Sequence, residues 1–577
     1  MSKLNIDQSS ILKLFSDKKS DFLIPDYQRP YAWSDAECQT LWDDIFEFAF
    51  PGEDYSKFNA EEEYYLGPIV TFKNDDNKKE IIDGQQRLTT LLLLLRAFYV
   101  KFGNMKDVKS VETAKKISTC IWKTDEFGEP DKNLLKIDSE VATDSDKEEF
   151  LNILKTGNAE GLKSKYAENY RFFQKKIGEF LDNYPSYFPF LPIRILNNCI
   201  LLPIEADDQN TALRIFSTLN DRGKPLSDAD IFKAQFYKYF KDLGKKDEFI
   251  ATWKSLEEKC DKMFNPQSGT PLDELFTRYM YFERAKQGIT SSTTEALRKF
   301  YEKNKYSILK SEETLANLVD LANFWEDVNN QDEDRFSTEV LKKLFVLNYA
   351  PNGMWTYFIS VYYLQNRKED KKLDEELFIE FLNKTIAYIW AYAMYMPGVN
   401  ALRTPIYAEM VNIVNNKKVE FNDRKFDIPQ LRTIIENYEF YNRRPITKSM
   451  LAWWAFEDEE QELIELDKVF DIEHIYARNR YEKEKSLSDY KLVDKLGNKS
   501  LLEKRINIRA SDYRFSDKKK YYVGFKTATG KDKLGTDIKT LRDLASNDDF
   551  VETDVITRND TIINAFIKYV VDNNLSK

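Results

Sequence analysis

The chain contains a single histidine, His474, which directly follows Glu473 in the stretch FDIEHIYARNR (Phe470–Arg480). Hydrolysis of a phosphodiester needs a base that takes a proton from water at neutral pH, and histidine is the side chain best suited to that step. A divalent cation assists by neutralising charge on the phosphate, and oxygen ligands suit Mg²⁺ or Mn²⁺. Neighbours on a strand point to opposite faces, but at a strand end Glu473 and His474 can both reach one site.

Two asparagines follow in the next stretch, LGNKSLLEKRIN (Leu496–Asn507). We expect Asn498 at the end of a strand and Asn507, nine residues later, in the helix after it. From Lys499 to Lys526 the chain carries nine Lys or Arg and three Asp or Glu, a local charge of +6 that could hold phosphates. A solvated helix face would explain the same charges.

This arrangement resembles the ββα-metal nuclease motif of the HNH family. The resemblance implies that His474 is the general base and that Asn498 holds the catalytic loop in shape. It also implies that Glu473 and Asn507 bind the metal, Mg²⁺ or Mn²⁺. The family often has proline three residues after the histidine, where this chain has Ala477. The alternative is that His474 is a hydrogen-bonding residue of the core.

A second group of candidate residues lies in IIDGQQRLTTLLLLL (Ile81–Leu95), which predicts a strand, a tight turn at Gly84 and a helix. This geometry gathers backbone N–H groups and a helix dipole at one point, which favours an anion such as phosphate. Arg87 could add a bidentate phosphate contact, and Thr89 or Thr90 a hydroxyl. Asp83 could hold a cation or orient water.

Two further segments stand out, IPDYQRPYAW (Ile24–Trp33) and FSTLNDRGKPLSDADIF (Phe216–Phe232). The second exposes Asn220 and Arg222 at a glycine turn and continues into a helix-capping box, Ser227 to Asp230. Ordinary turn and cap chemistry is the alternative for each segment. The chain has no GxxxxGK[ST] motif, which excludes a P-loop NTPase.

Together the three segments resemble the N-terminal domain of GmrSD-type modification-dependent (type IV) restriction endonucleases. That domain is related to the ParB/sulfiredoxin fold and has DGQQR as its hallmark, and the family pairs it with an HNH-type C-terminal domain. The resemblance implies binding or hydrolysis of a nucleoside triphosphate whose identity stays open. The nucleotide-site residues are Tyr27, Gln28, Arg29, Asp83, Gly84, Gln85, Gln86, Arg87, Thr89, Asn220 and Arg222.

The elements that must position these residues follow from hydrophobic patterning. We expect an α+β multidomain protein, with a ParB/sulfiredoxin-like α/β domain over 1–240, a mostly helical middle region over 241–445 and a ββα-metal (HNH) nuclease domain over 446–577. The predicted elements are strands Leu66–Phe72, Lys79–Gly84 and Cys199–Ala206, a helix Leu88–Gly103 and a Trp-rich helix, MLAWWAFEDEEQELIEL, over Met450–Leu466.

Composition sets outer limits on the class of protein. The 577 residues, 42% of them hydrophobic and 32% charged, are too many for one core and typical of a globular chain. The longest aliphatic run, Leu91–Leu95, is far short of the roughly 20 residues that a membrane span needs, and the first residues contain no apolar leader. The four cysteines form no CxxC pair, which indicates a reducing cytoplasm and excludes a cysteine-built zinc site.

We therefore expect a cytoplasmic anti-phage endonuclease that acts on modified foreign DNA, with a nucleotide-binding N-terminal domain gating a metal-dependent C-terminal nuclease. The net charge of −11 does not argue against DNA, because the basic residues are local. One alternative is a nucleotide-responsive DNA-binding regulatory protein without cleavage activity. Another is a nuclease acting on RNA or on the host's own DNA. The modification sensed, nicking versus double-strand cutting, and homo-oligomer formation stay open.

Overall fold

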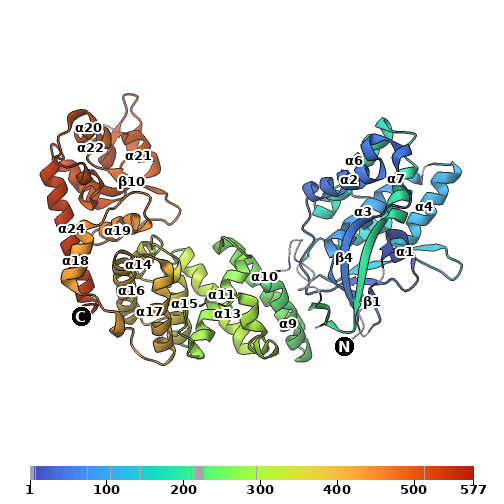
Figure 1. The fold of residues 1–577 in the computed structure, drawn as a ribbon, viewed down its shortest axis with the longest axis horizontal. Coiled ribbons are helices and arrows are strands. Elements are labelled where there is room, and N and C mark those ends of the chain that lie inside the picture. Colours follow the sequence, from blue (N-terminus) through green and yellow to red (C-terminus); the bar gives the residue numbers. More distant parts are fainter. Residues whose placement is uncertain are drawn as a thin grey trace. The chain divides into compact units, whose positions relative to one another are not determined.

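The structure, a computed structural model, describes residues 5–6, 8–74, 76–103, 105–141, 144–209, 211–213, 215, 227–293, 295–511 and 514–577. The chain forms two compact units, Met1–Lys254 and Ser255–Lys577, and each is described by itself (Figure 1). The finer division into three domains stays a prediction. The mixed α and β content of a multidomain protein is as expected.

The first unit is built on one mixed sheet. Its strands are β1 (Asn5–Ile6), β2 (Ser9–Ser10), β3 (Phe22–Ile24), β4 (Tyr64–Lys73), β5 (Lys79–Asp83), β8 (Ile137–Ser139) and β9 (Cys199–Ala206). Their order is β1-β9-β4-β5-β3-β8, and β2 also pairs with β9. β4 runs parallel to β9 and antiparallel to β5, while β3 runs parallel to β5 and β8. A separate pair joins β6 (Trp122–Thr124) to β7 (Pro130–Leu135).

One almost fully buried helix packs at the centre of this unit. It is α3 (Gln85–Phe102), whose five consecutive leucines, Leu91–Leu95, all lie in the core. A helix that is apolar on every side must be covered on every side, and here α4, α5 and α6 contact it. The helices around it are α1 (Ile11–Ser16), α2 (Asp35–Ala49), α4 (Val108–Ile121), α5 (Lys147–Thr156), α6 (Lys165–Asn183), α7 (Phe190–Asn198) and α9 (Asp228–Asp242).

The predicted elements of this unit are confirmed. The three predicted strands correspond to β4, β5 and β9, and the predicted helix to α3. The expected capping box is also present, since the Ser227 hydroxyl accepts from the Asp230 N–H and the Asp230 carboxylate accepts from the Ser227 N–H. The helix α3 begins three residues earlier than predicted, because Gly84 turns the chain directly into it.

The second unit begins with a helical region. All regular elements described between residues 246 and 455 are helices, as expected for the middle of the chain. The α-helices are α10 (Lys246–Met263), which contains the boundary between the units, and α11 (Pro271–Lys286), α12 (Leu297–Glu302), α13 (Glu312–Asn329), α14 (Thr338–Leu347), α15 (Met354–Asn366), α16 (Glu375–Tyr395), α17 (Val399–Val414), α18 (Ile428–Asn437) and α19 (Pro445–Ala455), and the 3-10 helices are η3 (Lys303–Lys305), η4 (Ser307–Leu309) and η5 (Asn422–Arg424).

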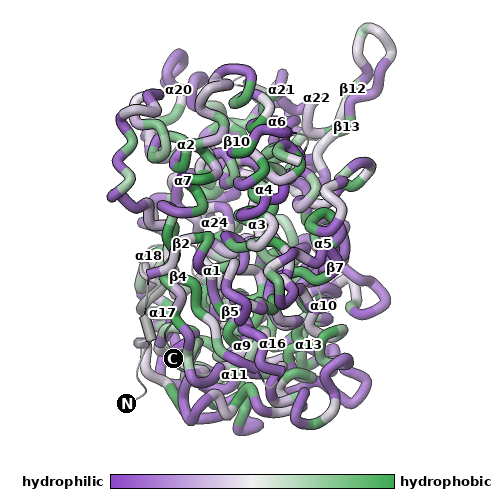
Figure 2. The backbone as a smooth tube through the Cα atoms, turned by 90° about the vertical axis from the view of Figure 1, so that its right-hand side faces the viewer, coloured by the Kyte–Doolittle hydropathy of each residue, from purple (hydrophilic) through white to green (hydrophobic). Residues whose placement is uncertain are grey.

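The last part of this unit mixes short strands and helices. An antiparallel pair, β10 (Phe470–His474) and β11 (Lys499–Glu503), is followed directly by α21 (Lys504–Ala510), which packs against both strands. A second pair, β12 (Gly524–Lys526) and β13 (Asp532–Leu534), forms a projecting hairpin (Figure 2). The remaining elements are α20 (Arg478–Glu484), the 3-10 helices η6 (Tyr490–Asp494) and η7 (Leu496–Asn498), α22 (Phe515–Val523), α23 (Lys539–Asp543) and α24 (Glu552–Asp572).

The predicted Trp-rich helix is shorter than expected. It is α19, and it ends at Ala455, whereas the prediction extended to Leu466. The residues after it include Glu457, Asp458, Glu459 and Glu460, and carboxylates at a helix C-terminus oppose the helix dipole. The apolar spacing of this segment is helical, but its charge stops the helix.

Two expectations from composition concern the whole chain. No helix in the described ranges combines the length and the apolar character needed to cross a bilayer. The four cysteines, Cys38, Cys120, Cys199 and Cys260, are all buried free thiols.

The helix α24 holds the turn before β11 in place. The Arg558 guanidinium donates to the carbonyls of Leu496, Gly497 and Lys499, at 3.2, 2.9 and 2.8 Å. The backbone of Gly497 lies against α24 so closely that an added Cβ would sit 2.0 Å from the Val555 carbonyl oxygen. The position therefore has no room for a side chain.

Substitution of Gly497 by alanine should destabilise this unit by about 3 kcal/mol, because backbone must move to relieve the overlap. Thermal unfolding followed by calorimetry measures the effect as a fall of several degrees in Tm. The matched control is Gly353→Ala, where nothing lies within 4 Å of the added Cβ. Equal Tm values for the two variants would contradict the close packing of α24 on this turn.

Candidate functional site

His474 is the last residue of β10, where it pairs with Lys499, the first residue of β11. Asn498 precedes β11 and does not end a strand, in contrast to the prediction. Its side-chain Oδ1 accepts from the Tyr476 N–H at 2.7 Å, and its Nδ2 donates to the carbonyls of Tyr476 and Val493 at 3.0 Å each. One buried amide therefore fixes the backbone directly after His474.

The His474 ring lies among three charged side chains that come from three different elements. Its Nε2 is 3.7 Å from Asp494 Oδ1, and the same oxygen accepts from Arg478 at 3.0 Å and from Lys499 at 2.8 Å. The distance of 3.7 Å is too long for a hydrogen bond. His474 Nε2 is thus buried without a hydrogen-bond partner among the described residues.

Lys499 is completely buried, which is rare for an ammonium group. It donates to the Phe440 carbonyl at 2.5 Å, to Asn442 Oδ1 at 2.9 Å and to Asp494. These three acceptors satisfy all three of its N–H donors. The charge is retained in the interior because it is fully paired, and it anchors Asp494 beside the histidine.

Burial is the main cause that lowers the pKa of His474, and the cations Lys499 and Arg478 lower it further. Asp494 acts in the opposite direction but does not outweigh burial. For Asp494 itself, burial alone would raise the pKa of the carboxyl, but its contacts with His474, Lys499 and Arg478 hold it well below the usual range. His474 is therefore neutral at pH 7, the form that can accept a proton.

Glu473 contacts a different set of residues from its neighbour His474. Its side chain is 3% exposed, and its Oε1 accepts from Lys518 Nζ at 2.8 Å and from the Tyr522 hydroxyl at 2.6 Å. Lys518 also donates to the His474 carbonyl at 2.7 Å. Because neighbours on a strand point to opposite faces, the carboxylate and the imidazole diverge.

The predicted metal-binding set is not assembled in the described part of the chain. Asn507 lies on α21, which packs on the strand pair, but it makes no hydrogen bond there with Glu473 or His474. No group of three or more His, Cys, Asp and Glu side chains able to hold a metal occurs among the described residues. Lys518 and Tyr522 both bind Glu473 Oε1, so this carboxylate is paired with a cation and a hydroxyl, and the described residues do not form a preformed metal site.

In the first unit, β5 turns into α3 at Gly84, which has φ +94°. A Cβ there would also lie 3.3 Å from the Pro68 carbonyl oxygen, so glycine suits both the conformation and the contact. The turn places Asp83 at the end of the strand and Arg87 in the first turn of the helix. Arg87 donates to the Pro68 carbonyl at 2.9 Å.

Three predicted nucleotide-site glutamines hold the backbone of this region. Gln28 donates to the carbonyls of Ile81 and Ile82, at 3.3 and 3.2 Å. Gln85 donates to the Arg29 carbonyl, and Gln86 donates to the Pro30 carbonyl and accepts from the Ala32 and Trp33 N–H groups. The 24–33 segment thus packs against β5 and the start of α3, and the hydrogen bonds of these three amides hold it there.

Two buried polar atoms near these glutamine amides have no hydrogen-bond partner among the described residues. They are Arg29 Nε and Gln85 Oε1. Burial raises the pKa of the nearby Asp83 carboxyl, more than Arg87 and Arg29 lower it. Burial likewise lowers the pKa of Arg87. The unpartnered Arg29 donor next to a helix N-terminus is suited to an anionic group of a ligand, whereas the Gln85 oxygen would need a hydrogen-bond donor.

The other predicted residues of this group are placed as follows. Thr89 is buried within α3, and Tyr27 is buried with its hydroxyl donating to Glu80 at 3.2 Å. Asn220 and Arg222 lie outside the described residues. The Tyr27 hydroxyl is thus paired with Glu80, and the Thr89 side chain is buried in the core.

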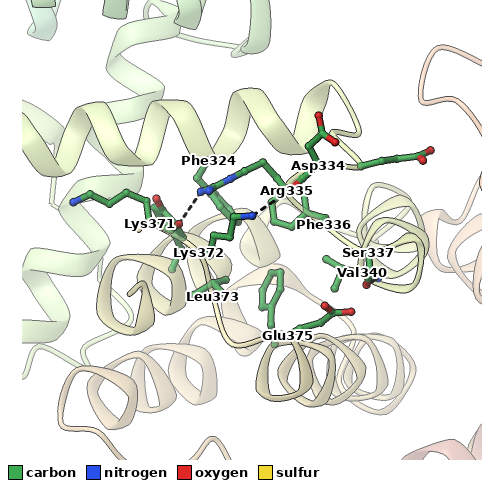
Figure 3. A pocket seen from close by; sticks show the side chains of 13 residues that line it. Phe324, Asp334, Arg335, Phe336, Ser337, Val340, Lys371, Lys372, Leu373 and Glu375 are labelled. Carbon is green, nitrogen blue, oxygen red and sulfur yellow. Dashed lines mark hydrogen bonds between the residues drawn. The ribbon is translucent and has the colours of Figure 1, made fainter. Parts of the chain in front are cut away.

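A separate cavity of about 350 Å³ lies in the helical region of the second unit and contains none of the predicted residues (Figure 3). Its Arg335 is paired with Asp327 and with the Lys371 carbonyl, and Lys371 is paired with Asp320. Arg335 and Lys371 are thus already paired with carboxylates within the fold.

Sequence reasoning missed four residues of the candidate centre, namely Asp494, Lys499, Lys518 and Tyr522. All four lie within 50 residues of His474, but their contacts depend on how the strand pair, η6 and α22 pack. Lys499 and Lys518 had been counted only as parts of a basic stretch. Their burial, with carboxylate, amide and carbonyl oxygens as partners, is not a property that local spacing encodes.

Comparisons with known proteins match both ends of the chain. A family model described as the N-terminal domain of the GmrSD restriction endonuclease matches residues 11–237. A second, described as the C-terminal domain of GmrSD restriction endonucleases, matches residues 415–565. Together the two matches cover more than half of the chain and lie in different compact units. No match was found among curated proteins.

The single histidine allows a direct test of its environment, because ¹⁵N-histidine labelling gives one set of ring signals. We expect His474 to titrate below its ordinary value of 6.5 and Asp494→Asn to lower its pKa further, since a charge that favours the imidazolium is removed. Because the unfolded chain binds the proton first, folding stability falls as the pH drops below about 6.5.

The control for this titration is Asp543→Asn, an exposed carboxylate on α23 paired with Lys539. It should leave the titration midpoint of His474 unchanged. A midpoint above 6.5 in the unmodified protein, or a rise on Asp494→Asn, would contradict the arrangement described here.

Proposed function

The chain belongs to the GmrSD restriction endonuclease family, and from this premise we propose that its C-terminal domain hydrolyses DNA while its N-terminal domain binds the controlling nucleotide. The observation that carries the proposal is His474 Nε2. It is buried, neutral at pH 7 and free of a hydrogen-bond partner among the described residues, at the end of a strand whose following turn is fixed by Asn498.

In the proposed reaction His474 takes the proton from the attacking water. A base needs a vacant nitrogen within hydrogen-bond reach of that water, which the unpartnered Nε2 provides. Asp494 lies close enough to stabilise the imidazolium that forms. Arg478, half of whose side chain is exposed, is placed to meet a phosphate oxygen.

The order of elements supports the ββα (HNH) assignment of this domain. Two antiparallel strands, β10 and β11, are followed at once by α21, which packs against both. His474 at the end of the first strand and Asn507 in the helix agree with the motif, whereas Asn498 precedes the second strand. Hydrogen bonds of Asn498 to Tyr476 support its role in holding the loop.

A divalent cation, Mg²⁺ or Mn²⁺, is part of this proposal as a requirement of the family. When bound, such a cation would neutralise negative charge on the phosphate. Glu473 and Asn507 would hold it only after Lys518 had released the carboxylate. We therefore assign no step of the reaction to the metal.

In the N-terminal domain the proposed ligand is a nucleoside triphosphate, held in a ParB/sulfiredoxin-like fold. Its phosphates would meet the first turn of α3 and Arg29, and a donor group of the ligand would satisfy the unpartnered Gln85 Oε1. Hydrolysis or binding there would gate the nuclease, as the pairing of the two family domains suggests. The target in this proposal is modified phage DNA in the cytoplasm.

One observation favours a second candidate, a nucleotide-responsive DNA-binding regulatory protein. The carboxylate expected to bind metal is already satisfied by Lys518 and Tyr522. A domain that only holds DNA would have no need to free it. This candidate predicts DNA binding without cleavage under every combination of metal, nucleotide and DNA modification.

The test of the nuclease is cleavage of matched modified and unmodified phage DNA, with Mg²⁺ or Mn²⁺ and with each nucleotide in turn. His474→Ala should reduce cleavage by about 10²- to 10⁴-fold, because general-base catalysis supplies roughly that factor. Circular dichroism and Tm check that the variant folds. If His474→Ala cuts as fast as the unmodified protein, the assignment of the base is wrong.

The nucleotide site has its own test, because Arg29 has an unpartnered Nε. Arg29→Ala should weaken binding of ATP or GTP by about tenfold or more, since a charge-assisted contact to phosphate is lost. Isothermal titration calorimetry measures each nucleotide separately. The control is Arg171→Ala, which removes a guanidinium committed to the Ala159 and Leu162 carbonyls. Equal affinities for the two variants would exclude this location.

A further inference from the structure

The hairpin of β12 and β13 stands apart from the other sheets of its unit. The two strands pair only with each other, with Gly524 opposite Leu534 and Lys526 opposite Asp532. Its turn is tied by hydrogen bonds between Thr527 and Lys531. Figure 2 shows it projecting well beyond the neighbouring helices. A two-stranded ribbon exposed in this way is at best marginally stable in water.

The side chains of this hairpin are both basic and unusually exposed. Lys526, Lys531 and Lys533 are exposed, against one carboxylate, Asp532, so the hairpin carries a net charge of +2 in a chain of net charge −11. Beside them Leu534 is 84% exposed. A large apolar side chain held in solvent between lysines has no role in folding that the structure shows.

The hairpin is connected directly to a helix of the candidate nuclease centre. It leaves the end of α22, the helix whose Lys518 and Tyr522 hold Glu473. The Tyr522 carbonyl also accepts from the Thr536 N–H at 2.9 Å, which holds the residues after β13 against the end of α22. Only one residue separates Tyr522 from Gly524, where β12 begins. From there the ribbon reaches roughly 10 Å to its turn.

We propose that the β12–β13 hairpin enters the major groove of the duplex DNA that is bound at the His474 centre. A two-stranded ribbon is one of the two elements that the major groove admits. The three lysines meet the phosphates that line the groove, and Leu534 meets the apolar edges of bases. This inference rests on the proposed function, because it takes the substrate of that centre to be duplex DNA.

The charges favour DNA over a second copy of this chain. An exposed strand edge can pair with the same edge of another molecule, but lysines along it oppose that pairing. In a homodimer formed through this edge the lysines of both copies would be brought together. In a DNA groove the same lysines replace condensed counterions, which is favourable.

The test measures binding of the full chain, in a His474→Ala background, to a fluorescein-labelled 30-base-pair duplex over a series of salt concentrations. The triple variant Lys526→Gln, Lys531→Gln, Lys533→Gln should lower the slope of log K against log salt by about 2 to 3, because each phosphate contact contributes roughly 0.9. At 0.1 M salt the affinity should fall roughly a hundredfold.

The matched control replaces three exposed lysines of the helical region, Lys310→Gln, Lys417→Gln and Lys418→Gln. It removes the same charge and should leave the salt slope unchanged. Equal slopes and affinities for the two triple variants would overturn the proposal. So would a loss of self-association, with DNA binding unaltered, on size-exclusion chromatography of the hairpin variant.

Leu534→Ala separates the apolar contact from the charges. It should weaken duplex binding by about tenfold while leaving the salt slope unchanged, because no counterion release is lost. Thermal unfolding should be unaffected, since the side chain is exposed in the free protein. Unchanged affinity for duplex DNA would contradict insertion of Leu534 into the groove.

Cleavage assays on the chain with His474 intact distinguish this inference from the proposed function. If the hairpin variant loses duplex binding but the intact chain never cleaves, the groove contact stands and the nuclease assignment fails. If the intact chain cleaves and the hairpin variant binds and cleaves like its control, the nuclease stands and the groove contact fails.

Discussion

The side-chain amide of Asn498 is the contact on which the geometry around His474 depends. This amide satisfies one N–H and two carbonyls of the backbone, and the backbone carbonyl of Asn498 accepts from the Ile475 N–H at 2.9 Å. Buried backbone groups must be paired, so no other residue type of this size could close the turn in the same way. The position of Lys499 also depends on Asn498, because Asn498 directly precedes it and fixes where β11 begins.

Buried charge is the second organising feature of this domain. Lys499 with Asp494 and Lys518 with Glu473 form two ion pairs on opposite sides of β10. Breaking either pair would leave an uncompensated charge in the interior, at a cost of about 3–5 kcal/mol. Side chains alternate between the two faces of a strand, so His474 with Asp494 lies on one face of β10 and Glu473 with Lys518 on the other. This division explains why Glu473 and His474 do not share one site.

Local patterns in the sequence were enough to predict β4, β5, β9 and α3, because each has a strong apolar pattern and because Gly84 marks the turn between β5 and α3. They were enough to single out His474, Asn498 and the segment around Gly84 as candidates. They were not enough for the end of α19, where charge overrides an apolar spacing. Nor could they show that the amides of Gln28, Gln85 and Gln86 form hydrogen bonds with backbone groups, because the packing of the 24–33 segment determines those partners.

The dependence of the turn at 496–499 on Arg558 also has a consequence for the order in which the chain is made. A ribosome synthesises β10 and β11 before it reaches α24. Until that helix emerges, the carbonyls that Arg558 satisfies are left to water and the surface that closes over Gly497 is open. A partly synthesised chain therefore contains His474 before the turn beside it is closed, so the geometry around the histidine is completed only when the last helix has been made.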